Sequence, residues 1–331
     1  MKILIVEDNN LARKVLVSYL EKIGYDIIQA ENGVDGYNKW KVHQPEIVLT
    51  DWNMPEGSGI DLVQNIRKNS DNHYSYIILI TSREDNKDLT IGFESGVDDY
   101  IVKPVNKQEL YLRMRAGERL LSLQAKEQLL FAMAKLAETR DYETGKHLER
   151  IRQYAKLLAL ELSKDERFKS KVNDLFIKSI YETSPLHDIG KVGVSDSILR
   201  KKDKLTEEEF EIMKHHTLIG KNTLEEVATN GHKGFLPMAI EIAGSHHEKW
   251  DGSGYPCGLK GEEIPLSARI VTLVDVYDAL RSKRVYKAAI EHFDVLETIK
   301  CESGKHFDPA LVEIFFSIEN AFKTISEQYS E

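Results

Sequence analysis

Two short stretches, HDIGK at residues 187–191 and HHEKWDGSGYP at residues 246–256, carry the densest polar chemistry of the chain. The first places an imidazole and a carboxylate on adjacent residues, with a lysine one helical turn further on. The second places two imidazoles side by side and then enters a turn rich in Gly and Pro. Imidazoles and carboxylates without a thiolate suit iron, manganese or zinc. We therefore expect a metal site around which this part of the chain is organised.

Further potential ligands accompany these stretches. Glu143 and His147 are four residues apart, so on a helix they share one face. His216 adds an imidazole, and Asp275 follows the apolar run 270–274. A carboxylate in an apolar helix needs a partner, because burying an unpaired charge is costly. A lone His-Asp pair would indicate little, but this number of neighbours favours a shared cluster.

The size and composition of the chain are those of a globular protein with two domains. It has 331 residues, 41% hydrophobic and 30% charged, and domains usually hold about 100–200 residues. The net charge of −9 argues against a duplex-DNA binder. Two cysteines, Cys257 and Cys301, provide no disulfide framework. No apolar run approaches the roughly 20 residues of a membrane helix, and the start turns acidic too soon for a signal peptide, so we expect a cytoplasmic protein without a membrane or DNA partner.

The first domain is expected at residues 1–118, where short apolar runs alternate with amphipathic helical patterns. Strands are predicted at 2–6, 27–30, 47–50, 76–81 and 100–102, and helices near 10–23, 34–42, 59–69, 85–95 and 106–117. Five such units predict an α/β doubly wound, five-stranded parallel sheet. In this fold the site lies at the carboxyl ends of the strands.

Polar residues stand at those predicted strand ends. Glu7 and Asp8 end the first strand, Asp51 the third, Thr81 the fourth and Lys103 the fifth. Three carboxylates together repel one another unless a cation lies among them, and oxygen ligands of this kind suit Mg²⁺. A lysine and a hydroxyl opposite them suit an incoming phosphoryl group. Acids can also simply cap strand ends, but five agreeing positions favour the site.

These motifs, VED at 6–8, TDWNMP at 50–55 and DDYIVKP at 98–104, resemble the receiver domain of two-component response regulators. The resemblance implies that Asp51 accepts phosphate from a sensor histidine kinase or phosphotransfer protein. It further implies that Mg²⁺ is held by Glu7, Asp8, Asp51 and the Asn53 carbonyl, that Thr81 and Lys103 contact the phosphoryl oxygens, and that Tyr100 is the aromatic switch. The Lys103-Pro104 bond is a candidate cis peptide.

A helical connector is expected at residues 119–141. Between 107 and 141 there is no Pro and a single Gly, Gly117, and two apolar stripes follow helical spacing. This pattern predicts one long helix that continues the last receiver helix into the second domain. The two stripes favour a homodimer that pairs through the receiver and the connector helix. The alternative is that both stripes pack within one chain.

The remaining residues, 142–331, show helical periodicity almost throughout and predict an all-α helical bundle with one long irregular loop at 251–265. Thr206 and Glu209 form a capping-box pattern at a helix start. His215, His232, His292 and His306 are expected to be ordinary loop or surface histidines.

The second domain resembles the HD-GYP phosphodiesterases, a branch of the HD metal-dependent phosphohydrolases, over roughly residues 130–320. The matching text is HDIGK at 187–191, HTLIG at 216–220, HHEKWDGSGYP at 246–256 and the segment 275–287. The resemblance implies the metal ligands Glu143, His147, His187, Asp188, His216, His246, His247 and Asp275. Eight ligands imply two or three divalent metals, with iron or manganese favoured and Asp188 as the bridge, and the presence of Glu143 favours three.

The same resemblance implies hydrolysis of cyclic di-GMP to the linear dinucleotide pGpG, to GMP, or to both. In such a site a hydroxide between the metals attacks phosphorus. Asp188 and Lys191 are the expected catalytic residues, and Lys191 would donate to a phosphate oxygen or protonate the leaving alkoxide. The expected substrate contacts are Lys191, Tyr255, Asp278, Arg284 and Lys287, and the alternative role for Asp278 is to orient Arg284 or a metal ligand.

Three functions remain open from the sequence. The leading one is a response regulator whose phosphorylation at Asp51 controls cyclic di-GMP hydrolysis. The second is a signalling scaffold that binds a cyclic dinucleotide without turnover, which the intact ligand set disfavours. The third is hydrolysis of another cyclic dinucleotide such as 3',3'-cGAMP, because the sequence does not decide base preference. A DNA-binding output finds no helix-turn-helix signature.

Overall fold

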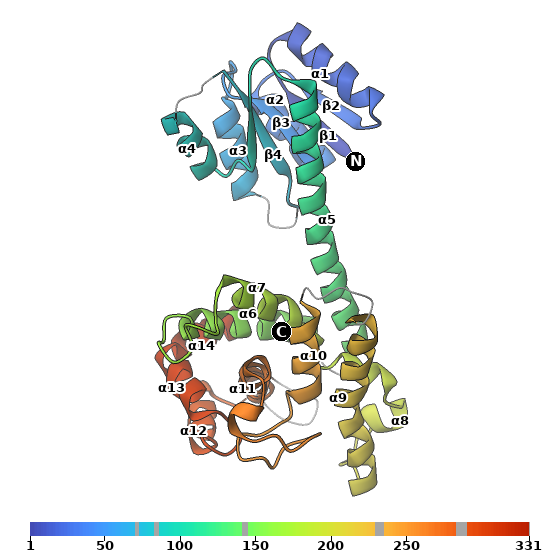
Figure 1. The fold of residues 1–331 in the computed structure, drawn as a ribbon, viewed down its shortest axis with the longest axis vertical. Helices are drawn as coiled ribbons and strands as arrows, with labels where there is room; N and C mark the ends of the chain where they lie inside the picture. Colours follow the sequence, from blue (N-terminus) through green and yellow to red (C-terminus); the bar gives the residue numbers. More distant parts are fainter. Residues whose placement is uncertain (70–72, 83–85, 141–144, 229–234, 283–289, 331) are drawn as a thin grey trace. The chain divides into compact units, whose positions relative to one another are not determined.

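The computed structural model describes residues 1–69, 73–82, 86–140, 145–228, 235–282 and 290–330 (Figure 1). The chain divides into two compact units, Met1–Lys126 and Glu127–Glu331, and each is described by itself. Among the described residues, no helix combines the length and the apolar character that crossing a membrane requires. The expected sites Glu143, Arg284 and Lys287, and also His232, lie outside the described residues.

The first unit contains a five-stranded parallel sheet in the order β2-β1-β3-β4-β5, so the predicted α/β fold is confirmed. The strands are β1 (Lys2–Val6), β2 (Asp26–Ala30), β3 (Ile47–Asp51), β4 (Tyr76–Thr81) and β5 (Asp99–Val102), joined by α1 (Asn10–Lys22), α2 (Gly33–His43), α3 (Gly59–Lys68) and α4 (Asn86–Glu94). The strand order reverses direction between β1 and β3. Ligand sites in such sheets lie at this switch point, beside the carboxyl ends of the strands.

Helices cover both faces of this sheet, which explains why its central strands are apolar along their whole length. On one face, side chains of α1 and of the first turns of α5 (Lys107–Glu138), including Leu110 and Met114, pack on Ile3 and Ile5. On the other face, residues of α2 and α3 pack on Leu4 and Val6. Because apolar side chains pack on both faces of the sheet, the polar side chains of the central strands lie at the strand ends. The Lys103-Pro104 bond is cis, as expected.

The predicted continuous helix is confirmed, because α5 is one helix of 32 residues, which ends at Glu138 within the expected connector 119–141. Near its end, Ala134 and Ala137 are buried within the second unit, and Ala134 packs in an apolar cluster with Leu148. The second apolar stripe instead remains exposed at Leu129, Met133 and Leu136. The first stripe therefore packs partly against other residues of the chain, whereas the second is an exposed apolar surface.

The second unit is helical, as predicted. Its helices are α6 (Gly145–Leu162), α7 (Asp174–Thr183), α8 (Asp196–Leu199), α9 (Glu207–Ala228), α10 (Leu236–Ser245), α11 (Leu266–Arg281), α12 (His292–Cys301), α13 (Pro309–Ser317) and α14 (Glu319–Gln328), with the 3-10 helices η1 (Ser184–Leu186), η2 (Ile189–Gly193) and η3 (Gly261–Glu263). The predicted capping box is present, since Glu209 N–H donates to the Thr206 hydroxyl and Thr206 N–H to the Glu209 carboxylate.

Helix α11 is the core element of this unit and is seen end on in Figure 1. It is buried over most of its length because helices surround it, and it packs closely on α6. Aromatic rings complete the core, with Tyr154 of α6 stacked on Phe322 of α14 and edge-on to Tyr277 of α11. An apolar helix of this kind can carry Asp275 and Asp278 only if other side chains compensate their charges.

Candidate metal centres

The first candidate site lies at the carboxyl ends of β1 and β3. Oxygens of Glu7, Asp8 and Asp51 lie within 4.8 Å of one another. The Lys103 Nζ atom lies 2.8 Å from Asp51 and 3.1 Å from Glu7. Burial raises the pKa of Glu7, while the hydrogen bond from Lys103 opposes this shift. Glu7 and Asp51 are buried and Asp8 is exposed, so the group opens toward solvent on one side.

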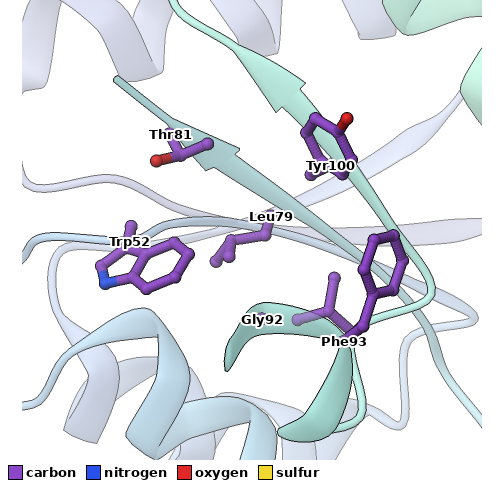
Figure 2. A pocket seen from close by; sticks show the side chains of 7 residues that line it. Trp52, Leu79, Thr81, Gly92, Phe93 and Tyr100 are labelled. Atoms are coloured by element: carbon purple, nitrogen blue, oxygen red, sulfur yellow. The ribbon is translucent and has the colours of Figure 1, made fainter. Parts of the chain in front are cut away.

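A small apolar pocket lies beside this acidic group (Figure 2). It contains two of the residues expected to respond to phosphorylation, Thr81 at the end of β4 and Tyr100 in β5. The Tyr100 ring also meets Phe93 of α4 edge to face, with 5.8 Å between ring centroids. Asn53, whose carbonyl is an expected ligand, lies two residues beyond Asp51 on the exposed side.

The second candidate site lies in the helical unit and contains two groups of donor atoms. The first group comprises Asp188, His216, His246 and His247, whose ligand atoms all lie within 4.8 Å of one another. Asp188 lies between η1 and η2, His216 lies on α9, and the other two histidines directly follow α10. The Asp188 Oδ1 atom is 3.3 Å from His216 Nε2 and 3.6 Å from His246 Nε2.

Glycine packing brings the Asp188 segment close to α9. Gly190 in η2 faces Gly220 of α9, and a Cβ atom added at Gly190 would lie 1.9 Å from the His216 carbonyl oxygen. Any side chain at this position would push η2 away from the helix. The two glycines of the HDIG and LIG motifs therefore position Asp188 against His216.

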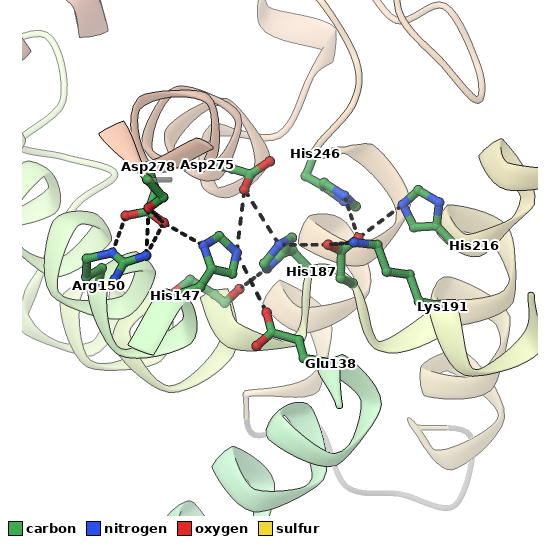
Figure 3. Close-up of polar contacts among 12 residues, drawn as sticks. Glu138, His147, Arg150, His187, Lys191, His216, His246, Asp275 and Asp278 are labelled. Atoms are coloured by element: carbon green, nitrogen blue, oxygen red, sulfur yellow. Dashed lines mark hydrogen bonds and ion pairs between the residues drawn. The ribbon is translucent and has the colours of Figure 1, made fainter. Parts of the chain in front are cut away.

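The second group comprises His147 on α6, His187 at the end of η1 and Asp275 on α11 (Figure 3). The Asp275 Oδ1 atom lies 3.7 Å from His147 Nε2 and 3.9 Å from His187 Nε2. Asp278, one turn after Asp275, contacts the other ring nitrogen of His147, with 2.7 Å between Oδ2 and Nδ1. Arg150 Nε donates to the same carboxylate at 2.6 Å, so Asp278 is compensated and holds the His147 ring.

Asp188 lies between the two groups, because its carboxylate faces both. While Oδ1 faces His216 and His246, Oδ2 lies 3.2 Å from His187 Nε2 and 2.8 Å from Lys191 Nζ. Two ligand atoms that each lie about 2.1 Å from one ion can be at most about 4.2 Å apart. The measured separations fit that limit, and the position of Asp188 suits a carboxylate that bridges two ions.

Three of the imidazoles are oriented by main-chain carbonyls. In each, Nδ1 lies within hydrogen-bond distance of a carbonyl oxygen, which can only accept, so Nδ1 carries a proton and Nε2 is the nitrogen whose lone pair a neutral ring presents to a ligand. The pairs are His187 with Ser184 at 3.0 Å, His216 with Met213 at 2.7 Å and His246 with Ile242 at 3.0 Å. Within the described part of the chain, these buried Nε2 atoms and Asp188 Oδ1 have no hydrogen-bond partner.

The protonation states agree with a ligand role. Burial lowers the pKa of His216 to about 4 and holds that of His247 well below its ordinary value. Burial also disfavours the Asp188 carboxylate, but Lys191 and His187 outweigh it and the pKa of Asp188 lies well below the ordinary range. For His187, burial lowers the pKa, but Asp188 prevails and raises it to about 9. The extra proton on His187 occupies the position at which a metal would bind, because metal binding displaces protons from its ligands.

These observations fit divalent metals. The donor set is imidazole nitrogen and carboxylate oxygen, the lone pairs point into a buried space, and an anionic carboxylate lies between the two groups. The supporting hydrogen bonds to Nδ1 are of the kind that fixes metal-ligating histidines.

The loop after His247 is anchored by a residue that sequence reasoning missed. The buried carboxylate of Glu248 accepts hydrogen bonds from the backbone N–H groups of Cys257 at 2.7 Å and Leu259 at 3.0 Å. This fixes the GYP turn, and the Tyr255 ring stacks on His247 with 4.7 Å between centroids. An acid directly after two histidines is equally compatible with a further metal ligand and with a loop anchor. The motif alone therefore does not predict the hydrogen bonds that Glu248 accepts from the loop.

Two other residues beside the site were also missed. Arg150 follows His147 by one helical turn, a spacing that could have indicated a shared face. Glu138, the last residue of α5, is 3% exposed, and its Oε1 atom lies 3.7 Å from His147 Nε2. By contrast, the histidine expected at the surface beside His216, His215, is exposed.

Comparison with known proteins defines the class of this chain. The model of the response regulator receiver domain matches residues 3–115, and the model of the HD domain matches residues 132–311. The chain is thus a response regulator in which a receiver domain precedes an HD domain of the metal-dependent phosphohydrolases.

Individual relatives place it more narrowly. It is 39% identical to a probable cyclic di-GMP phosphodiesterase of Vibrio cholerae over 86% of this chain and 70% of that protein. It is 33% identical to the cyclic di-GMP phosphodiesterase response regulator RpfG of Xanthomonas campestris over 100% of this chain and 91% of the relative. A 3'3'-cGAMP-specific phosphodiesterase of Vibrio cholerae is 38% identical over 60% of this chain and 36% of that protein. The chain belongs to the enzyme family of receiver–HD response regulators that includes named cyclic di-GMP phosphodiesterases.

Proposed function

We propose that this protein is a response regulator whose phosphorylation at Asp51 controls metal-dependent hydrolysis of cyclic di-GMP to pGpG, to GMP, or to both. The observation that carries the catalytic part is the Asp188 carboxylate, which faces His216 and His246 with one oxygen and His187 with the other. Relatives named cyclic di-GMP phosphodiesterases, which match this chain over 91% and 92% of their own length, support the substrate.

Two or three divalent metals, with iron or manganese favoured, would be held by His147, His187, Asp188, His216, His246, His247 and Asp275, with Glu143 as a further expected ligand. When bound, such metals supply a nucleophilic hydroxide and stabilise charge on the transferring phosphoryl group. The chain's own contribution is to fix the donors: main-chain carbonyls orient three imidazoles, and Asp278 orients that of His147.

Lys191 is proposed to act on the substrate from beside Asp188. Its Nζ atom lies 2.8 Å from Asp188 Oδ2, where an ammonium can donate to a phosphate oxygen or protonate the leaving alkoxide. Tyr255, held over His247 by the anchored loop, would line the substrate site. Arg284 and Lys287 remain proposed phosphate contacts on the strength of the motif. Asp278 is buried and bound by Arg150, so we assign it to support of His147 rather than to substrate contact.

The receiver would take its phosphoryl group from a sensor histidine kinase or phosphotransfer protein. Glu7, Asp8, Asp51 and the Asn53 carbonyl would hold Mg²⁺ beside it. Lys103 contacts Asp51, and together with Thr81 it would contact the phosphoryl oxygens. Tyr100 would respond at the adjoining pocket. The exposed stripe Leu129, Met133 and Leu136 on α5 supports homodimerisation through the connector.

The test is turnover of cyclic di-GMP by the purified protein loaded with Mn²⁺ or Fe²⁺ under anaerobic conditions. We expect pGpG or GMP to form, the rate to change after treatment with acetyl phosphate, and Asp51→Asn to abolish that change. Undetectable turnover with every metal, at the level of Asp188→Asn, would reject the enzyme. A rate that responds equally in the Asp51→Asn variant would reject phosphorylation control.

A second candidate is a phosphodiesterase for 3',3'-cGAMP, favoured by the 38% identity over 60% of this chain to a relative of that name. Turnover of the two cyclic dinucleotides at matched concentrations separates the candidates. A rate for 3',3'-cGAMP well above that for cyclic di-GMP would reassign the substrate and leave the metal chemistry in place. Tight binding of either nucleotide without turnover would instead indicate the scaffold.

A further inference from the structure

Arg140, two residues after the end of α5, binds the segment that follows the HDIGK motif. Its guanidinium donates to the carbonyl oxygen of Val192, to that of Val194 at 3.0 Å and to the Asp196 carboxylate at 2.7 Å. The side chain is half-buried. The three acceptors alternate along the chain, so one planar group holds the whole stretch 192–196.

Two of these acceptors lie at the C-terminal end of η2. Val192 is the last residue but one of this short helix, and Val194 is its C-cap residue. The last carbonyls of a helix have no partner inside it, and a basic side chain can satisfy them. A guanidinium offers several donors in a rigid fork, which the single ammonium of a lysine does not. Arg140 therefore fixes the end of η2 in one position.

Lys191 lies within the segment that is fixed in this way. Its Nζ atom is 2.8 Å from Asp188 Oδ2 (Figure 3). The start of η2 is held differently, by the close packing of Gly190 on α9. Asp188 precedes that glycine contact, whereas Lys191 lies between it and the first carbonyl that Arg140 binds. The two contacts therefore divide the work: α9 sets the place of the carboxylate, and Arg140 sets that of the lysine.

We propose that Arg140 is a positioning residue that acts through Lys191. By holding the end of η2, it keeps the ammonium where it meets a phosphate oxygen or the leaving alkoxide. The inference rests on the proposed phosphodiesterase function and adds a residue outside the metal-donor groups. Because Arg140 directly follows the last turn of α5, the same contact joins the end of the connector helix to the segment that carries Lys191.

The first test compares rate and metal content in Arg140→Met, which keeps the apolar length of the side chain and removes its donors. Displacement of a catalytic group by about 1 Å can cost about 100-fold in rate, so kcat per metal-loaded chain should fall by about 10–100-fold with KM little changed. Elemental analysis without substrate should show the wild-type amount of metal. Arg167→Met, which removes an exposed arginine paired with Asp165 and Glu313, is the matched control and should keep the wild-type kcat.

A double-mutant cycle shows whether the effect passes through Lys191. In Lys191→Ala, measured in single turnover with enzyme in excess, the further change Arg140→Met should cost less than about threefold, because residues that act together are not additive. An equally large loss in that background would overturn the proposal and assign Arg140 a general structural role. Loss of metal in Arg140→Met, or a wild-type kcat, would overturn it as well.

Amide hydrogen exchange reports on the same contact without turnover. The N–H groups of Lys191 and Val194 are hydrogen-bonded within this segment, and in Arg140→Met they should exchange about fivefold faster or more while α9 stays protected. If this variant fails to fold, as judged by circular dichroism, Arg140→Gln takes its place in every measurement.

The exchange result also separates this inference from the proposed function. Faster exchange in Arg140→Met, together with a wild type that does not hydrolyse cyclic di-GMP, would keep the hold of Arg140 on η2 and remove the proposed function. Hydrolysis by the wild type, with exchange and kcat unchanged in Arg140→Met, would do the reverse.

Discussion

The acidic group of the receiver and the donor groups of the helical unit compensate their carboxylates in different ways. In the receiver, the ammonium of Lys103 lies 2.8 Å from Asp51 and 3.1 Å from Glu7, so part of the charge is balanced by the chain itself. In the helical unit, buried imidazole Nε2 atoms that have no hydrogen-bond partner among the described residues surround Asp188, and Lys191 places a positive charge 2.8 Å from it.

This difference in charge compensation indicates which metal ion suits each site and how readily that ion exchanges. Oxygen ligands on a partly exposed edge suit Mg²⁺, which keeps several waters and exchanges readily. A buried set of imidazoles with a central carboxylate suits a transition metal and makes that metal part of the folded structure. Under the proposed function, the transient phosphorylation signal would be received at the first site, and the hydrolysis that needs fixed ions would take place at the second.

The largest expected effect follows from the bridge position of Asp188. Asp188→Asn removes the charge that faces both donor groups, so we expect the second unit to lose metal and hydrolysis to fall by more than about 100-fold, beyond the range for supporting residues. Phosphorylation of the receiver should be unchanged. Elemental analysis, turnover and acetyl-phosphate labelling measure the three quantities.

The exposed Asp174 at the start of α7 provides the control, and Asp174→Asn should keep both metal and turnover. Metal retained in Asp188→Asn at the wild-type level would contradict the bridge and place the two donor groups on independent ions.

Removal of metal should distinguish the two units directly. With a metal present at about 100 times its Kd, chelation costs about 2.7 kcal/mol, which lowers the unfolding temperature of a domain of this size by roughly 5–10 °C. The receiver, in which Lys103 compensates two acids, should shift far less. Differential scanning calorimetry with and without a chelator resolves the transitions. Equal shifts of the two unfolding temperatures, or no shift in either, would contradict the proposed difference between the two sites.

A smaller effect is expected from the residue that orients His147. Asp278→Asn removes the charged acceptor shared by His147 Nδ1 and Arg150, so metal affinity at the His147 group should fall by about 10–100-fold. The ions at Asp188, His216 and His246 should remain. Metal titration of the variant beside the wild type measures this. A uniform loss at every site would indicate that Asp278 supports the whole fold and not one imidazole.

The smallest expected effect concerns His306, a half-buried histidine outside both donor groups. Burial lowers its pKa, and Lys249 contributes in the same direction. A pKa below the unfolded value of about 6.5 means that the unfolded chain binds the proton more tightly, so stability should decline as the pH falls below about 6.5. Urea unfolding of metal-free protein across this range should show a weaker decline in His306→Gln. Parallel curves for the two proteins would contradict this assignment.

The receiver could be predicted largely from sequence because parallel strands bring their ends to one edge. Glu7, Asp51 and Lys103 each follow an apolar run, and the order of the runs alone places them together. The helix bounds differ by a residue or so, apart from the last helix, whose continuation toward residue 141 was itself expected from the absence of Pro and which ends at Glu138.

The site in the helical unit was harder to predict from the sequence, because its side chains are brought together by helix packing and not by the shared edge of a sheet. The motifs identified the histidines but could not show which donor atoms lie together. His187 and Asp188 are adjacent in the chain, yet His187 lies in the group with Asp275, whereas Asp188 lies in the group with His216. Glu138 and Arg150 lie outside the motif text, and their proximity to His147 depends on how α5 and α6 meet. Residues 141–144, with Glu143, lie outside the described residues.

The unbroken helix α5 has a consequence for the spacing of its residues. At 1.5 Å and about 100° per residue, 32 residues span roughly 48 Å, and every insertion turns one end relative to the other. One added residue in the exposed middle would alter the angular phase between Met114 and Glu138, while seven would nearly restore it at greater length. The number of residues in α5 therefore sets the angle between the side chains at its two ends, separately from the identity of any side chain on it.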